Sequence, residues 1–177
     1  TLIVAAILKT GLNDAGIAAL HLVLGAGTIL LSYATARRLG LSRSSLVAAA
    51  ITAVDPLLLQ STALVMTETL AAFLLALLFW TIAPNAESVP PTNGRLLGVG
   101  LVFGLNALCR PTIWAFGALA AAWWILRRVG RRKVVNPLPI FLGILLITSP
   151  WVVRNITVLG RPILTTTHGG YTLLLGN

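Results

Sequence analysis

The chain has 177 residues, of which 57% are hydrophobic and 10% charged, and its mean hydropathy is +0.93. Soluble domains are about half apolar and about one quarter charged, so this scarcity of charge excludes an ordinary water-soluble globule and indicates a membrane protein. Lys and Arg number 13 against 4 acids, but they cluster between apolar runs, as membrane topology requires, so we expect no nucleic-acid partner.

The apolar runs predict one all-α domain, a polytopic membrane helix bundle with about six transmembrane helices. About 20 residues, at 1.5 Å per residue, cross a hydrocarbon core of about 30 Å. The expected spans, in chain order, are residues 16–36, 45–59, 62–83, 96–109, 111–126 and 138–153. Residues 154–177 are mixed in composition and rich in Thr and Gly, and we expect an external segment there.

Prolines set two of these boundaries. Asp55-Pro56 predicts a break or kink near Val54, because proline lacks the helical N–H and restricts the residue before it. Residues 96–126 are uncharged except for Arg110, and as one helix they would be about 46 Å long, too long for one crossing. Arg110-Pro111 therefore predicts two short spans.

Two further patterns concern helix ends and helix packing. Ser44 and Ser45 follow a basic loop and are suited to cap the helix that begins there. Gly98, Gly100 and Gly104 are spaced for close packing between membrane helices and not for dinucleotide binding.

The basic residues predict the orientation of the spans. Alternating the six spans places the basic loops 37–43 and 127–133 on one face, which the positive-inside rule assigns to the cytoplasm. The opposite face then holds three acids, Asp14, Asp55 and Glu68.

Glu68 and Arg110 are the leading candidates for chemistry. A carboxylate in the outer third of an apolar helix costs a few kcal/mol unless it is paired or faces a polar cavity. Glu68 therefore either serves function or offsets the positive end of a helix. Arg110 is suited to bind the phosphate of a lipid carrier with two hydrogen bonds, or to pair with Glu68 or Asp55.

Four other polar residues have both a functional and a structural interpretation. Asp55 is a substrate contact or the polar end of a helix. Arg154 and Asn155 contact a headgroup or phosphate, or anchor the end of a span at the interface. His168, before two glycines, is a base or ligand, or part of a turn. The sequence has no His/Cys cluster with metal-ligand spacing and no phosphate loop, so neither a metal site nor a cofactor is evident.

A series of short motifs runs through the chain in a fixed order. They are Ala36-Arg37-Arg38-Leu39-Gly40, Asp55-Pro56, Thr67-Glu68, Gly104-Leu105, Leu108-Cys109-Arg110-Pro111, Pro150-Trp151, Arg154-Asn155, Gly160-Arg161, Thr165 to Thr167, Gly169-Gly170 and Gly176-Asn177. Their order and spacing resemble the bacterial branch of the protein mannosyltransferase and aminoarabinose transferase family, membrane glycosyltransferases of the C-type fold.

The resemblance implies a polyprenyl-phosphate-linked sugar as donor and a protein or glycolipid acceptor, in a multi-pass protein of the bacterial inner (plasma) membrane that works at its outer face. Such a reaction needs a general base and cations that stabilise the leaving phosphate. By position, Arg110 and Arg154 are the candidates for the phosphate, and Glu68 for orienting the sugar or an arginine.

Family members place their catalytic acid in an external loop after the first span, and no such loop occurs here. The resemblance therefore assigns no catalytic residue to this chain, and we expect a fragment of the transmembrane domain that is inactive alone. The alternative is a segment of a multi-pass transporter or channel, with Glu68, Asp55 and Arg110 along the substrate path.

Overall fold

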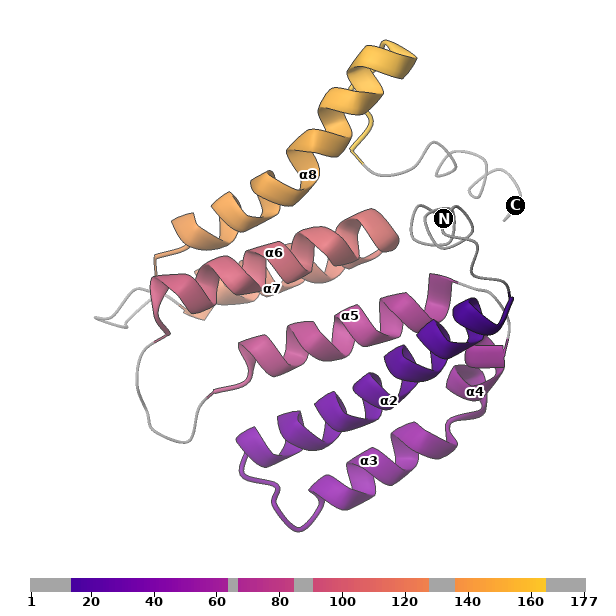
Figure 1. Cartoon of the computed structure of the whole chain (residues 1–177). Coiled ribbons are helices and arrows are strands. Elements are labelled where there is room, and N and C mark those ends of the chain that lie inside the picture. Colours follow the sequence, from indigo (N-terminus) through magenta and orange to yellow (C-terminus); the bar gives the residue numbers. More distant parts are fainter. Residues whose placement is uncertain (1–13, 64–66, 85–90, 128–135, 165–177) are drawn as a thin grey trace, which may run out of the picture. The chain divides into compact units, whose positions relative to one another are not determined.

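The computed structural model describes residues 14–63, 67–84, 91–127 and 136–164. Every regular element in these residues is an α-helix (Figure 1). The helices are α2 (Asp14–Arg38), α3 (Ser45–Val54), α4 (Pro56–Ala63), α5 (Thr67–Ile82), α6 (Asn93–Cys109), α7 (Ile113–Arg127) and α8 (Leu138–Leu159). Two of them, over Ala15–Arg38 and Leu138–Leu159, are long and apolar enough to cross a membrane. The expected class, a partial membrane helix bundle, is confirmed.

The chain divides into two compact units, Thr1–Pro90 and Pro91–Asn177. Among the described residues, the first unit contains α2 to α5 and the second contains α6 to α8. Each unit has its own packing and is described by itself.

In the first unit, α2 packs against α3, α4 and α5. α3 returns antiparallel to α2, whereas α5 runs in the same direction as α2 (Figure 1). The turn after α2 contains Gly40 in the left-handed region, with φ of 80°, and the Leu41 N–H donates to the Ala36 carbonyl at 3.0 Å. Leu78 of α5 is fully buried and Leu74 nearly so.

These helix directions separate the charges of the first unit. Arg37 and Arg38 end α2, and Arg43 lies in the loop before α3. Asp55 follows the other end of α3, and Glu68 lies in the first turn of α5. The basic residues therefore lie at one end of the unit and these acids at the other.

Both predicted helix breaks are confirmed. α3 ends at Val54, Asp55 is extended with ψ of 116°, and α4 begins at Pro56. α6 ends at Cys109, Arg110 is extended, and α7 begins at Ile113. The predicted capping at Ser44 is wrong as a side-chain contact, because the Ser44 side chain makes no capping bond. The Ser45 hydroxyl instead donates back to the Ser42 carbonyl at 2.8 Å.

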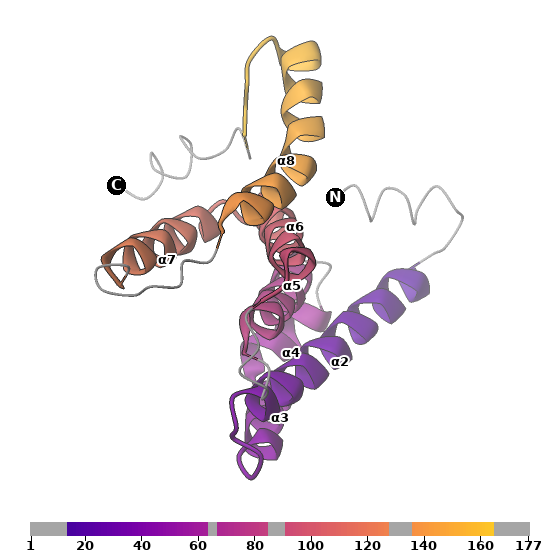
Figure 2. The same ribbon diagram turned by 90° about the vertical axis from the view of Figure 1, so that its left-hand side faces the viewer.

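In the second unit, α6 and α8 pack backbone to backbone. A Cβ atom added to Gly100 would overlap the Ile140 carbonyl, and one added to Gly143 would lie 2.5 Å from the Leu97 carbonyl oxygen. Gly104 instead packs on a side chain, because a Cβ added to it would lie 2.9 Å from the Cβ of Ile147. All three contacts lie in the first half of α8, which then extends away from α6 (Figure 2).

The glycine prediction is therefore confirmed for Gly100 and Gly104, and for Gly98 it stays a prediction. A Cβ at Gly98 would meet no described atom within 4 Å, because this residue lies on the face of α6 turned away from α8. Successive residues of an α-helix point about 100° apart, so Gly98 and Gly100, which are two residues apart, lie on nearly opposite faces of α6.

The last helix also differs from the expected span. α8 continues past Val153 to Leu159, with Pro150 inside it, and ends at Gly160, which has φ of 67°. Arg154 and Asn155, which we expected in the external segment, thus belong to this helix.

Candidate functional site

Asp55 is the N-cap of α4. One carboxylate oxygen accepts hydrogen bonds from the backbone N–H groups of Leu57, at 2.9 Å, and Leu58, at 3.2 Å. Pro56 fills the first helical position, where no N–H is needed. The structural interpretation of Asp55, the polar end of a helix, thus has a specific contact, while a role toward substrate stays a prediction.

Glu68 occupies the first turn of α5 and is half-buried. A carboxylate there is stabilised by the positive end of the helix. Its neighbour Thr69 is 3% exposed and donates from its hydroxyl to the Ser61 carbonyl at 2.8 Å, which ties the start of α5 to α4. Asp55 and Glu68 therefore both stand at helix N-termini at the acidic end of the first unit.

Arg110 lies in the turn between α6 and α7, with an exposed side chain. Its backbone N–H donates to the Asn106 carbonyl at 2.7 Å, and its carbonyl accepts from Ile113 at 3.2 Å, so the turn is held on both sides. The expected pairing of Arg110 with Glu68 or Asp55 would join the two units, and it stays a prediction.

Arg154 and Asn155 lie side by side on α8 but face different surroundings. Asn155 is 2% exposed, and its side-chain amide donates to the Ile163 carbonyl at 2.8 Å. It thereby holds the chain that turns back after Gly160. Arg154 is exposed, with its guanidinium carbon 5.3 Å from the centre of the Trp151 ring and one nitrogen 3.4 Å from the Asn155 side-chain oxygen.

The candidates fall into two groups. Asp55 and Glu68 belong to the first unit, whereas Arg110, Arg154 and Asn155 belong to the second. α6 and α8 run in the same direction (Figure 1). Arg110 directly follows the C-terminal end of α6, and Arg154 lies in the second half of α8, which extends away from α6 (Figure 2). His168 lies outside the described residues. No group of three or more His, Cys, Asp or Glu within the described ranges is placed to hold a metal ion.

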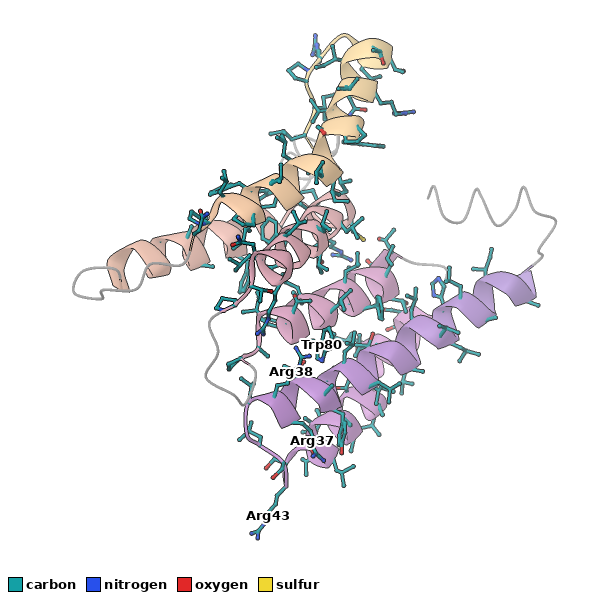
Figure 3. All side chains as sticks on the ribbon, turned by 60° about the vertical axis from the view of Figure 1, so that its left-hand side comes forward. Arg37, Arg38, Arg43 and Trp80 are labelled. Atoms are coloured by element: carbon teal, nitrogen blue, oxygen red, sulfur yellow. The ribbon has the colours of Figure 1, made fainter. Side chains whose placement is uncertain are left out.

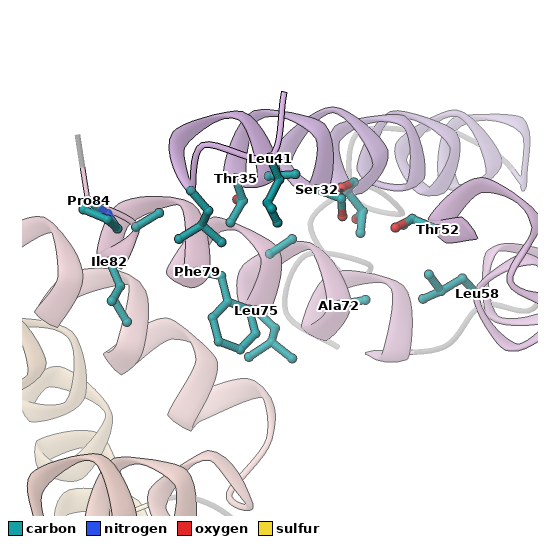
Figure 4. A pocket seen from close by; sticks show the side chains of 15 residues that line it. Ser32, Thr35, Leu41, Thr52, Leu58, Ala72, Leu75, Phe79, Ile82 and Pro84 are labelled. Atoms are coloured by element: carbon teal, nitrogen blue, oxygen red, sulfur yellow. Dashed lines mark hydrogen bonds between the residues drawn. The ribbon is translucent and has the colours of Figure 1, made fainter. Parts of the chain in front are cut away.

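One feature of the first unit was missed from the sequence, a cavity of about 590 Å³ among α2, α3, α4 and α5 (Figure 4). The residues that line the cavity are mostly apolar, like those of any membrane span, so amino-acid composition does not reveal the cavity. The available signal was the spacing of Thr28, Ser32 and Thr35, which places three hydroxyl residues on one face of α2.

Comparison with protein families gives a match over most of the chain. The family model described as dolichyl-phosphate-mannose-protein mannosyltransferase matches residues 2–153. The match spans α2 to α7 entirely and reaches Val153 in α8. No curated protein and no solved structure gives a significant match.

Proposed function

Because the chain belongs to the dolichyl-phosphate-mannose-protein mannosyltransferase family of membrane glycosyltransferases, we propose that it serves the transfer of a sugar from a polyprenyl-phosphate carrier to an acceptor. The family match over residues 2–153 carries this proposal. The acceptor is a protein or glycolipid at the outer face of a bacterial inner membrane.

In this reaction, an acceptor oxygen attacks the anomeric carbon of the donor sugar. The bond from that carbon to the phosphate oxygen breaks, and the lipid phosphate leaves with its electron pair. Negative charge grows on the phosphate in the transition state, so fixed cations that meet it lower the barrier. A general base accepts the proton of the acceptor, and we assign no described residue to that role.

Arg110 and Arg154 are the proposed cations. Both side chains are exposed. Arg110 follows the C-terminal end of α6 and Arg154 lies in the second half of α8, and these two helices run in the same direction. A guanidinium presents a planar set of donors that matches two phosphate oxygens at once. The held turn at Arg110 fixes its backbone, which reduces the conformational entropy lost when the phosphate binds. Glu68 is proposed to orient the sugar or an arginine.

The proposed topology is multi-pass, with loops 37–43 and 127–133 in the cytoplasm. The charge separation in the first unit supports this arrangement, because Arg37, Arg38 and Arg43 then face the cytoplasm while Asp55 and Glu68 face the outside.

The test uses the full-length protein in proteoliposomes with a polyprenyl-phosphate sugar, with sugar transfer as the measurement. Loss of one transition-state hydrogen-bond donor costs about 100-fold or more in rate, so we expect Arg110→Ala and Arg154→Ala each to lose that much. Arg110→Lys should regain part of the activity. Arg95→Ala is the matched control, since Arg95 lies in the first turn of α6, the helix that ends directly before Arg110.

The outcomes separate the function from the site. Absence of transfer by the unsubstituted protein with every polyprenyl-phosphate sugar tried would overturn the function. Transfer by the wild type that is unchanged in Arg110→Ala and Arg154→Ala would keep the function and remove these two residues from the site.

A further inference from the structure

The cavity of the first unit is a groove along α2. It is about 590 Å³, within the range of about 300–1,000 Å³ that small-molecule sites occupy. A second cavity of about 250 Å³ adjoins it and shares four lining residues with it, Thr28, Thr52, Leu58 and Ala72. Figure 4 shows side chains of α2, α3, α4 and α5 around the larger cavity.

The lining of the groove suits a hydrocarbon chain. Three of its hydroxyls already donate to carbonyls of their own helices: Thr28 to Leu24 at 2.8 Å, Ser32 to Thr28 at 2.9 Å, and Thr52 to Ala48 at 2.9 Å. They therefore have no hydrogen left to offer a ligand. The rest of the wall is largely apolar.

The length of the groove corresponds to one leaflet. On α2 and the residue directly after it, the lining extends from Thr28 to Leu39, which at 1.5 Å per residue is about 16 Å. Half of a hydrocarbon core of about 30 Å is about 15 Å. A chain that fills the larger cavity from its mouth thus reaches about the middle of the bilayer.

The mouth of the groove is basic. Leu39 and Leu41, each 53% exposed, line it within the loop that contains Arg43. Arg43 is exposed and makes no hydrogen bond or ion pair with any described residue, and it points away from the helices (Figure 3). Arg37 is also exposed, and Tyr33, one turn earlier on α2, accepts a 3.2 Å hydrogen bond from the Arg37 guanidinium. No acid occurs between residues 37 and 54.

One polar atom lies between the apolar wall and this basic mouth. The Oγ1 atom of Thr35 is buried and has no hydrogen-bond partner in the described part of the chain, although Thr35 lines the groove. A buried hydroxyl without a partner costs about 1–3 kcal/mol, which a ligand acceptor at this level would recover.

Along its length, the groove therefore presents first an apolar wall, then the hydroxyl donor of Thr35, and then the guanidinium groups of Arg37 and Arg43. A glycerophospholipid has the same order, with acyl chain, ester carbonyl and phosphate. We propose that the groove binds an anionic glycerophospholipid, with one acyl chain between α2 and α5, an ester carbonyl at Thr35, and the headgroup at Arg37 and Arg43. This site is separate from the residues proposed for the sugar donor, and it does not depend on sugar transfer.

The test uses the full chain in vesicles of phosphatidylcholine that contain a small fraction of phosphatidylglycerol with a diazirine in one acyl chain. Light should attach this probe to groove residues such as Leu75 and Ala76. Unlabelled phosphatidylglycerol should compete, whereas phosphatidylcholine and a polyprenyl phosphate should compete less. An arginine near an anionic headgroup contributes about fivefold in affinity, so Arg37→Ala with Arg43→Ala should weaken binding about 25-fold.

A second pair of variants tests the groove itself. Ala76→Phe places a ring in the cavity and should block attachment of the probe, while Leu30→Phe, at a site on α2 that is 67% exposed and outside the lining, should not. The arginine variants keep the test decisive if Ala76→Phe fails to fold, because both arginines are exposed. Attachment outside the groove, equal competition by phosphatidylcholine, or stronger competition by polyprenyl phosphate would overturn the proposal.

Discussion

The guanidinium of Arg38 lies 3.9 Å above the centre of the Trp80 ring and also donates a 2.8 Å hydrogen bond to the carbonyl oxygen of Trp80 (Figure 3). Trp80 is in the last turn of α5, where backbone carbonyls have no partner within the helix. A cation there also meets the negative end of the helix. Arg38 thus joins the C-terminal ends of α2 and α5, whereas among the described residues the adjacent Arg37 bonds within its own helix, to Tyr33.

We expect Arg38→Ala to lower the free energy of unfolding by about 1–3 kcal/mol, because it removes a charged hydrogen bond and a cation–π contact. Arg37→Ala removes the same charge from an exposed side chain and should cost less than about 0.5 kcal/mol. Thermal denaturation of the purified protein in detergent measures both. Equal losses in the two variants would mean that only the charge, and not the contact with Trp80, matters.

Local rules in the sequence predicted the helix breaks. Asp55-Pro56 and Arg110-Pro111 end helices through the chemistry of proline itself, and the structure breaks at both. The Arg38–Trp80 contact had no comparable signal, because its partners are 42 residues apart and depend on how α2 and α5 pack.

In the candidate site, too, contacts between distant segments could not be predicted from the sequence. Sequence reasoning selected Asn155 as a polar residue near a span end, but its burial depends on the chain returning after Gly160 to meet it. The groove arises from the spacing between helices, which no single segment encodes. Hydrophobicity places a segment in the membrane, but it does not say which face of the helix meets a neighbour.

Gly100 and Gly98 form a matched pair for testing which face of α6 packs against α8. Gly100→Ala would force its new methyl group against the backbone of Ile140, which cannot rotate away, so we expect a loss of about 1–3 kcal/mol. Gly98→Ala has open space and replaces a poor helix former, so its effect should be neutral or stabilising by up to about 1 kcal/mol. Unfolding in a detergent titration measures both, and similar losses at the two positions would contradict the close α6–α8 packing.

Asp55 can be tested with two substitutions that separate capping from charge. Asp55→Asn keeps a side-chain oxygen that accepts from Leu57 and Leu58, so stability should change little. Asp55→Ala removes the acceptor and should cost about 0.5–2 kcal/mol. If capping is the whole role of Asp55, sugar transfer by the full-length Asp55→Asn protein should match the wild type. Loss of transfer at unchanged stability would instead assign the carboxylate a role toward substrate.

Asn155 provides the sharpest test of the turn after α8. Its amide is buried and donates to the Ile163 carbonyl, so Asn155→Ala should cost about 1–3 kcal/mol and leave that carbonyl without its partner. Asn155→Asp should have the same effect, because an ionised carboxylate cannot donate. Hydrogen exchange of a peptide covering residues 156–164 should accelerate in both variants. Thr157→Val is the control, since the exposed Thr157 hydroxyl donates only within α8, to the Arg154 carbonyl. The explanation is contradicted if exchange also accelerates in Thr157→Val, or if it does not accelerate in the Asn155 variants. Either result would show that the returning chain is held by something other than this amide.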